Sequence, residues 1–304
     1  MENNLLYSLD TQTQYLNLAR DLSRVNSKNE EVTTRDGHVY GYMVEMKFLG
    51  MNPLVYAAPN SWRMRNAFRK FHAYRNIMFE NAGVEGDELG RYGKTIRPYL
   101  DYGHTLPTSV TLDPATSNSQ SGDWDIDGGE WTYSQLATTP TYVEGPTPNV
   151  EEPWADAFSL HICEENIVQG DTVEKSGYYK SVGMIHSYNI DRQEPRTAIV
   201  GTGETITGPS NPLAQLISSG NQAVGEVIDI TEDQELEFPP YDLEDNGDSI
   251  QVAPVALSGS TAEFPVAKLT AFLPAGLARI YIGAAASGYM HVRVLGKVLC
   301  KDMA

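Results

Sequence analysis

The sequence contains few cysteines and no long hydrophobic run, and each shortage excludes a class of protein. Its 304 residues include two cysteines, Cys163 and Cys300. A disulfide framework would need more of them, so we expect buried free thiols. No run approaches the roughly 18 apolar residues of a membrane-spanning helix. The first residues, MENNLLYSLDTQTQ, lack the basic and apolar regions of a signal peptide, and we therefore expect synthesis in the cytoplasm.

Basic residues are also scarce relative to acidic ones. The chain has 22 Lys and Arg against 40 Asp and Glu, for a formal net charge of −18, and neither end carries a basic tail. Neutralising many nucleic-acid phosphates requires positive surface, so we expect no extensive direct binding of nucleic acid. Residues 63 to 97 hold eight bases and four acids, which gives +4 there and −22 elsewhere. The chain therefore has one basic region in an acidic background.

One long segment shows helical periodicity, and it runs from residue 60 to residue 83. Asn60 or Ser61 can cap its start, and Gly83 can end it. Apolar residues recur along it at helical spacing: Met64, Ala67, Phe68, Phe71, Tyr74 and Met78. The opposite face carries five bases: Arg63, Arg65, Arg69, Lys70 and Arg75. This basic face is either solvated or in contact with acidic surface of a neighbouring copy.

Most of the remaining sequence is typical of strands and turns. The 26 glycines and 17 prolines are scattered as in all-β proteins, and we count about seven strand-like segments in each half. The fold class is therefore predicted to be all-β, with two jelly rolls and one inserted amphipathic helix. A proline-rich stretch near the middle of the chain predicts the boundary between the rolls.

The predicted domains follow from these segments. Residues 1–35 are expected to form an N-terminal arm, residues 36–150 the first jelly roll with helix 60–83, and residues 151–304 the second jelly roll. Within the second roll, the sequence from Tyr178 to Ile190 predicts one long strand with a bulge at Gly183.

A single motif suggests a metal. Asp123, Asp125 and Asp127, followed by Gly128, match the opening of a calcium-binding loop, in which alternate carboxylates converge on one cation. Position twelve of such a loop would be Ser134, where a glutamate is wanted. The same residues therefore fit either a calcium site or a plain acidic surface loop, and no other cofactor is indicated.

The sequence shows no catalytic motif. The six histidines are dispersed and no G-x-S-x-G or H-E-x-x-H pattern occurs, and His161 and His186 are expected to be packed or hydrogen-bonded within strands. We therefore predict that the protein is not an enzyme. Four aromatic residues could instead form a sugar-binding platform or pack in a core or interface: Trp124, Trp131, Tyr133 and Tyr142. A carbohydrate-binding or hydrolytic β-sandwich module therefore remains an alternative.

Two segments resemble viral capsid proteins: WRMRNAFRKFHAYRNIMFENAGVEGDELGRYGKTIRPYL and FLPAGLARIYI. In size and style the chain is similar to the short double jelly-roll major capsid proteins of small icosahedral bacteriophages with an internal membrane, such as the Flavobacterium-infecting lipid-containing single-stranded DNA phage. This resemblance implies homotrimers with two upright rolls per chain. A shell outside a membrane would not need an arginine-rich arm, in agreement with the N-terminal sequence.

The leading hypothesis is thus a structural major capsid protein that forms homotrimers and assembles into an icosahedral shell. Its partners would be copies of itself, minor capsid proteins and an internal membrane, and its location would be the virion after synthesis in the host cytoplasm. A single-jelly-roll capsid protein with a projecting domain is a further alternative.

Overall fold

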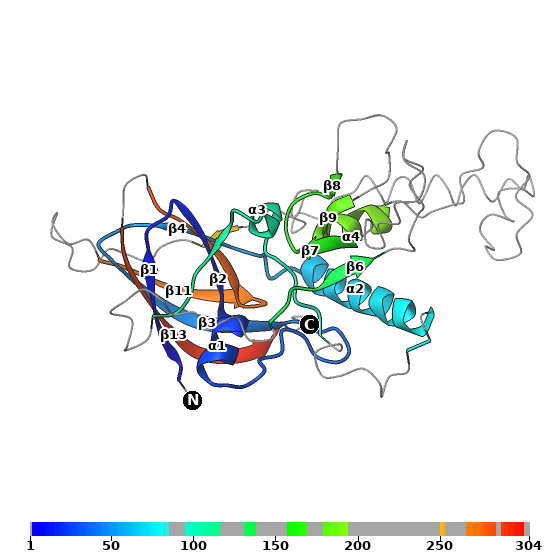
Figure 1. Ribbon diagram of the computed structural model, residues 1–304, viewed down its shortest axis with the longest axis horizontal. Coiled ribbons are helices and arrows are strands. Elements are labelled where there is room, and N and C mark those ends of the chain that lie inside the picture. The colour runs from blue at the N-terminus through cyan, green and yellow to red at the C-terminus, as the bar shows by residue number, and fades with distance from the viewer. Residues whose placement is uncertain are drawn as a thin grey trace, which may run out of the picture.

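The computed structural model describes residues 2–81, 83–84, 95–115, 131–137, 157–168, 179–193, 250–252, 266–283 and 287–300. Within these residues the chain is mostly β-strand in several sheets with few helices, which confirms the all-β prediction. Figure 1 shows sheets A and B at one end of the molecule, and a third sheet with α2 and α4 at the other.

Sheet A has four antiparallel strands in the order β1-β13-β3-β11. Their bounds are Asn4–Leu9 for β1, Gly288–Leu299 for β13, Tyr40–Leu49 for β3 and Val266–Pro274 for β11. Buried and exposed residues alternate along β1, most of β3 and most of β11, as expected for strands with one face on a core.

Sheet B has five strands in the order β10-β4-β12-β2-β5. Their bounds are Ile250–Val252 for β10, Leu54–Ala57 for β4, Leu277–Tyr281 for β12, Thr13–Asn17 for β2 and Val110–Thr111 for β5. All neighbours are antiparallel except β2 and β5. The buried residues of both sheets belong to one hydrophobic core.

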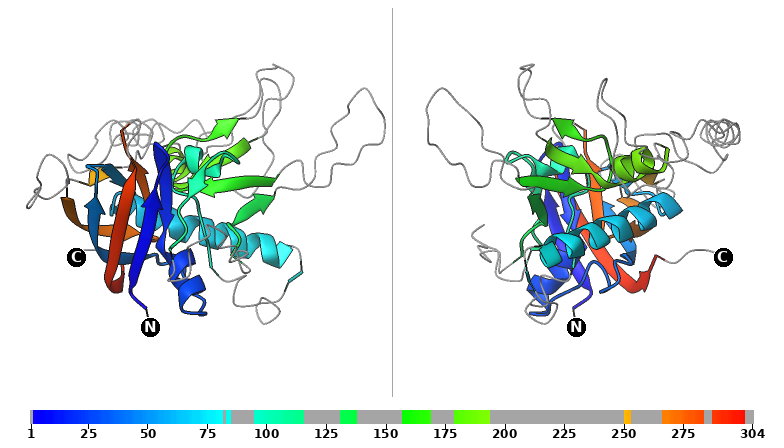
Figure 2. Two further views of the ribbon diagram at one scale, coloured as in Figure 1. Left: turned by 60° about the vertical axis from the view of Figure 1, so that its left-hand side comes forward. Right: turned by 90° about the vertical axis from the view of Figure 1, so that its right-hand side faces the viewer.

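Eight of these strands pair in a nested order. The first pairs with the last (β1 with β13), the second with the seventh (β2 with β12), the third with the sixth (β3 with β11) and the fourth with the fifth (β4 with β10). The left-hand view of Figure 2 shows the first of these pairs, with β1 in blue beside β13 in red. Ala57 lies opposite Ile250, so residues 58–249 form an insertion whose two ends are adjacent.

This pairing corrects the predicted domains. Strands from the first 57 residues share both sheets with strands that follow residue 249, so residues 36–150 and 151–304 do not form two separate rolls. Residues 1–35 are not an arm either, because β1 and β2 are strands of sheets A and B. In β1 the buried Leu5, Tyr7 and Leu9 alternate with exposed residues. That pattern covers only six residues, which explains why the prediction missed it.

Helix α1, Leu18–Val25, follows β2 directly and begins at Asn17, whose side chain accepts a hydrogen bond from Arg20 N at 3.1 Å. An asparagine at this position satisfies one of the free N–H groups of the first turn. Helix α1 is therefore part of the folded core and not of an arm, since Leu18, Ala19 and Leu22 are buried.

The predicted long helix is present as α2, Trp62–Asn81. Ser61 Oγ accepts a hydrogen bond from Met64 N at 3.2 Å, as an N-cap does. Gly83 has a φ of +73° and Val84 N donates to Phe79 O at 3.0 Å. This is the bond that closes a helix through a left-handed glycine, so both predicted ends of the helix are confirmed.

The described part of the insertion also contains a third sheet, sheet C, in the order β6-β7-β9-β8, with β7 and β9 parallel. The bounds are Gln135–Ala137 for β6, Ala157–His161 for β7, Tyr179–Gly183 for β9 and Ile167–Val168 for β8. The described part of the insertion also contains a short helix α3, Tyr102–Thr105, and a longer helix α4, Met184–Gln193. Helix α4 lies beside α2, as the right-hand view of Figure 2 shows.

The predicted strand from Tyr178 to Ile190 is wrong beyond Gly183, where β9 ends and α4 begins. A Cβ atom on Gly183 would lie 1.9 Å from Glu164 O, so the close approach of two backbones explains the glycine. The residues after it bury Met184, Ile185 and Asn189, a helical spacing. The prediction failed because Val182, Ile185 and Tyr188 also favour strands.

Both cysteines are buried and free, as predicted. Cys163 is fully buried after β7 and Cys300 is 3% exposed after β13. Burial raises the pKa of the Cys300 thiol to about 12, which keeps it protonated.

The pairing of the first strand with the last can be tested with one disulfide. Asn4 lies opposite Arg293, and the Val294 N to Asn3 O bond marks the two as a non-hydrogen-bonded pair. Such pairs have Cα atoms about 4.5 Å apart, within the range that a disulfide spans. We expect the double variant Asn4→Cys/Arg293→Cys to form an intramolecular disulfide, seen as faster migration on a non-reducing gel.

The matched control is Asn4→Cys/Thr270→Cys. Thr270 lies in β11, opposite Glu45 of β3, and β11 and β1 are the two edge strands of sheet A. About three strand spacings of 4.8 Å therefore separate Thr270 from Asn4. Equal oxidation of the two double variants would show that β1 does not pair with β13.

Candidate functional site

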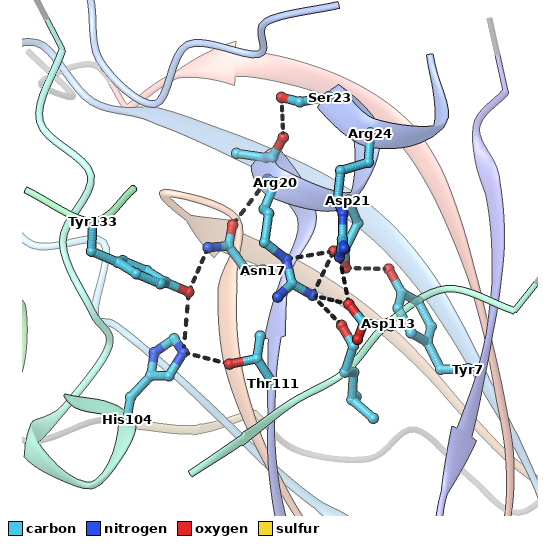
Figure 3. A network of polar contacts seen from close by, with 12 residues as sticks. Tyr7, Asn17, Arg20, Asp21, Ser23, Arg24, His104, Thr111, Asp113 and Tyr133 are labelled. Carbon is cyan, nitrogen blue, oxygen red and sulfur yellow. Dashed lines mark hydrogen bonds and ion pairs between the residues drawn. The ribbon is translucent and has the colours of Figure 1, made fainter. Parts of the chain in front are cut away.

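A buried polar network joins the insertion to sheet B and α1 (Figure 3). At its centre Asn17 accepts a hydrogen bond from Arg20 N and donates one from Nδ2 to the Tyr133 hydroxyl at 3.0 Å. The Tyr133 hydroxyl lies 3.3 Å from His104 Nε2. Residues that are distant in the sequence thus form one continuous chain of hydrogen bonds, in which Asn17 is 1% exposed.

One arm of the network surrounds the fully buried carboxylate of Asp21 on α1. Tyr7 donates its hydroxyl proton to Asp21 at 2.8 Å, and Arg20 Nε donates at 2.9 Å. Arg20 also forms an ion pair with Asp113 at 2.9 Å, and Arg24 binds the same Asp113 oxygen. This arm fixes the segment after β5 against α1 and β1.

The other arm surrounds His104 on α3, which is 2% exposed. Its Nδ1 accepts a hydrogen bond from Leu100 N at 3.2 Å, so the single proton of the neutral ring lies on Nε2, beside Thr111 Oγ1 and the Tyr133 hydroxyl. The ring stacks on Tyr15 of β2 with centroids 4.3 Å apart. Both ring nitrogens are therefore engaged within the protein.

Asp101 links the same helix to β12. It is fully buried, caps α3 by accepting from His104 N at 2.9 Å, and accepts from Arg279 at 2.9 Å. Arg279 in turn lies over the Tyr56 ring at 4.7 Å. Loss of this ion pair would destabilise the fold, because the Asp101 carboxylate is buried and would lose a charged partner.

Burial shifts the pKa values of His104 and Asp21 in opposite directions. Burial and the nearby Arg20 lower the pKa of His104 to about 3, so its ring is neutral near pH 7. Burial raises the pKa of Asp21 to about 6, although Arg20 and Tyr7 oppose that rise. Every donor named here serves another residue of the chain, so the arrangement fastens the insertion to sheet B.

The five predicted contact bases on α2 do not share one exposed face. Arg63 is 1% exposed, which contradicts its expected place on a solvated face, and its guanidinium lies 5.9 Å from the Trp62 ring. Lys70 donates to Ser187 O on α4 at 3.0 Å, and Arg75 donates to Thr95 O. Burial, together with Arg97, lowers the pKa of Arg75 to about 10.

Of the remaining two bases, Arg69 is exposed and Arg65 is half-buried. The apolar stripe predicted for the same helix is buried at Met64, Ala67, Phe68 and Phe71, while Tyr74 is 38% exposed. The basic side of α2 thus packs partly inside the insertion, against α4 and residues near Thr95, because the long stems of Lys and Arg can lie along apolar surface.

The predicted calcium ligands Asp123, Asp125 and Asp127 lie outside the described residues. Within the described ranges, no three His, Cys, Asp or Glu side chains come together in a way that could hold a metal ion.

Two of the four residues proposed for a sugar platform are engaged inside the protein. Trp131 lies under the guanidinium of Arg97 at 4.4 Å. Tyr133 stacks on Tyr99 with centroids 3.8 Å apart. Trp124 and Tyr142 lie outside the described residues. The two described rings therefore follow the packing alternative.

His161 and Ser181 form the arrangement that most resembles a catalytic pair. His161 Nε2 lies 3.1 Å from Ser181 Oγ, and Nδ1 faces Cys163 O. Both residues have no exposed surface, so a substrate cannot reach the hydroxyl in this conformation. His161 lies in β7 as predicted, whereas His186 lies in α4 and not in a strand.

Sequence reasoning missed the residues that build the network, among them Asp101, His104 and Arg279. The one local signal was the spacing of Asp101 and His104, which is that of a helix cap. Nothing in the sequence near Arg279 indicates that its partner is 178 residues away.

In the described part of the chain, no helix has the length and hydropathy needed to cross a bilayer. Comparisons with protein-family models, with curated proteins and with solved structures each found no match to this chain.

The pKa values of His104 and Asp21 predict opposite effects of pH on stability. Below pH 6.5 an unfolded chain binds a proton at His104 that the folded chain excludes down to about pH 3, so acid destabilises the fold. Between pH 3.8 and about 6 the folded chain keeps a proton on Asp21 that the unfolded chain releases, so rising pH destabilises it. The two effects cancel between about pH 4 and 6.

We therefore expect the free energy of unfolding of Asp21→Asn to fall by about 2–3 kcal/mol more than that of the wild type when the pH falls from 6 to 4. The reason is that the effect of His104 is then unopposed. For His104→Gln, the free energy of unfolding should rise relative to that of the wild type by a similar amount over the same pH step, because only the effect of Asp21 remains. The double variant serves as the control and should follow the wild-type slope. Urea unfolding at each pH measures these slopes, and parallel curves for all four proteins would contradict the assigned shifts.

Proposed function

We propose that the chain is a structural capsid protein of a small icosahedral virus, built on one eight-stranded jelly roll. The observation that carries this proposal is the nested pairing of β1–β4 with β10–β13. A jelly roll is a long antiparallel hairpin wound into two sheets, and such a hairpin pairs the first strand with the last and the fourth with the fifth. Viral capsid proteins are among the proteins that use this architecture.

Lectins and cupins use the same architecture, so the fold by itself does not choose between them. The two described members of the predicted sugar platform, Trp131 and Tyr133, are engaged with Arg97 and Tyr99. The insertion between the fourth and fifth strands is long, and its described part adds a third sheet and three helices to the roll. A shell-forming roll that carries a long insertion accounts for the engaged aromatic residues and for the additional sheet and helices.

This proposal favours one roll per chain over two. All eight nested strands are needed for the first roll, and they come from both ends of the sequence. The insertion would then be the projecting or bridging part of a single-roll capsid protein. Homotrimers, lattice contacts between them, minor capsid proteins and an internal membrane are the partners that we propose, and the virion is the proposed location.

Assembly in solution tests the proposal. A chain of 33.5 kDa that builds a shell should form a closed oligomer such as a trimer of about 100 kDa, or larger particles, at micromolar concentration. Size-exclusion chromatography with light scattering measures the mass, and negative-stain microscopy shows closed shells. A stable monomer across that concentration range would overturn the proposal.

A further inference from the structure

The face of sheet A that points away from the core carries most of the exposed apolar surface of the described chain. Eleven large apolar side chains are exposed in the described residues, and six of them lie on this face. Those six are Leu6, Met43, Leu49, Tyr289, Leu295 and Val298. We call this surface the outer face of sheet A. Monomeric soluble proteins rarely gather apolar side chains in this way unless a partner covers them.

Strand register places most apolar residues of the outer face at its two ends, whereas Leu6 lies opposite His291, beside the charged residues between them. At one end Tyr289 of β13 lies opposite Leu49 of β3, which lies opposite Val266 of β11. At the other end Met43 of β3 lies opposite Phe272 of β11. Directly opposed residues of antiparallel strands are in contact distance, so each end is a continuous apolar patch.

A charged band separates the two patches. Arg293 lies opposite Glu45, and Lys47 lies opposite Lys268. Lys268 and Lys47 both form ion pairs with Glu45, at 2.8 Å and 3.5 Å, and are about half exposed. Three bases against one acid leave two positive charges on this face of a chain whose net charge is −18.

The outer face of sheet B differs from that of sheet A, because part of it is covered by the insertion. There Tyr15 stacks on His104, and Arg279 pairs with Asp101, so residues of the insertion cover it. At its far end Leu54 and Tyr281 lie opposite each other and are 37% and 38% exposed. The insertion thus covers the polar centre of one outer face, whereas the outer face of sheet A has no comparable cover in the described residues.

We infer that the outer face of sheet A binds an acidic surface on a second copy of this chain. This inference rests on the proposed function and names one of its contacts. Packing the face against itself would oppose two surfaces of the same sign, whereas the rest of the chain is strongly acidic, so charge favours a heterologous contact. Heterologous contacts build rings and shells when their geometry closes.

The acidic partner surface is inferred from the charge of the whole sequence. Apart from the three bases and one acid of this face, 39 acids stand against 19 Lys and Arg. Positive charge on one face and acid elsewhere also fixes which surfaces meet, because like charges placed opposite each other disfavour the wrong pairing.

Two matched pairs of substitutions test the apolar part of the contact. Leu49→Ser/Tyr289→Ser removes an opposed aliphatic and aromatic pair from the outer face of sheet A. Leu54→Ser/Tyr281→Ser removes the same chemistry from a pair on sheet B that is 37% and 38% exposed, against 45% and 55% for the first pair. Light scattering across a concentration series should show at least a tenfold rise in the dissociation constant of self-association for the first variant and less than a threefold change for the second.

The charged band is tested in the same assay by Lys268→Glu. We expect at least tenfold weaker association at low salt, because the four charges of the band then sum to zero and its attraction to an acidic partner is lost. Lys28→Glu is the control, since Lys28 is 55% exposed and lies outside sheet A, beside Glu30. High salt should weaken association of the wild type and reduce the difference between the two variants.

The outcomes separate this inference from the proposed function. If the wild type assembles and the sheet A variants assemble equally well, the inference is overturned while the proposed function stands. If the wild type stays monomeric, both fail. If the wild type instead binds single-stranded DNA or anionic vesicles, and the sheet A variants lose only that binding, the face serves another ligand and the inference is overturned.

Discussion

Nested antiparallel pairing of the two ends of the chain is the constraint on which the rest of the structure depends. Strand β13 lies between β1 and β3 and pairs with both. A strand from the last residues of the chain therefore holds two strands from the first fifty in one sheet. Closing loops of this length costs conformational entropy before any contact forms, and the shared apolar core of sheets A and B is what offsets that cost.

The same pairing explains how a long insertion can be accommodated. Because Ala57 and Ile250 lie opposite each other, the chain can leave and re-enter sheet B at one point without disturbing any other strand pair. The insertion is then fastened by specific polar contacts, chiefly Asp101 with Arg279 and Tyr133 with Asn17. These contacts cover part of sheet B, whereas in the described part of the chain the outer face of sheet A stays exposed.

Local features of the fold could be predicted from the sequence, whereas long-range pairing could not. Ser61 and Gly83 bracket α2 because caps depend on a few neighbouring residues. The division at residue 150 failed because strand alternation shows which face is buried but not which strand is the partner.

The candidate site was harder to predict for a related reason. Arg63 stands among four other bases in the sequence, yet it alone is almost fully buried, since its place on α2 faces the protein interior. Asp101 and Arg279 form an ion pair across 178 residues. Such pairs depend on which elements the fold brings together, and composition and spacing contain no record of that.

Electron cryo-microscopy of particles assembled from the purified chain is the most direct test of the central claim. The account predicts one jelly roll per chain, with β13 between β1 and β3, with β5 of the insertion in sheet B and with sheet C outside sheets A and B. A map with two rolls per chain, or with the strands of the N-terminal and C-terminal ends in different sheets, would contradict it.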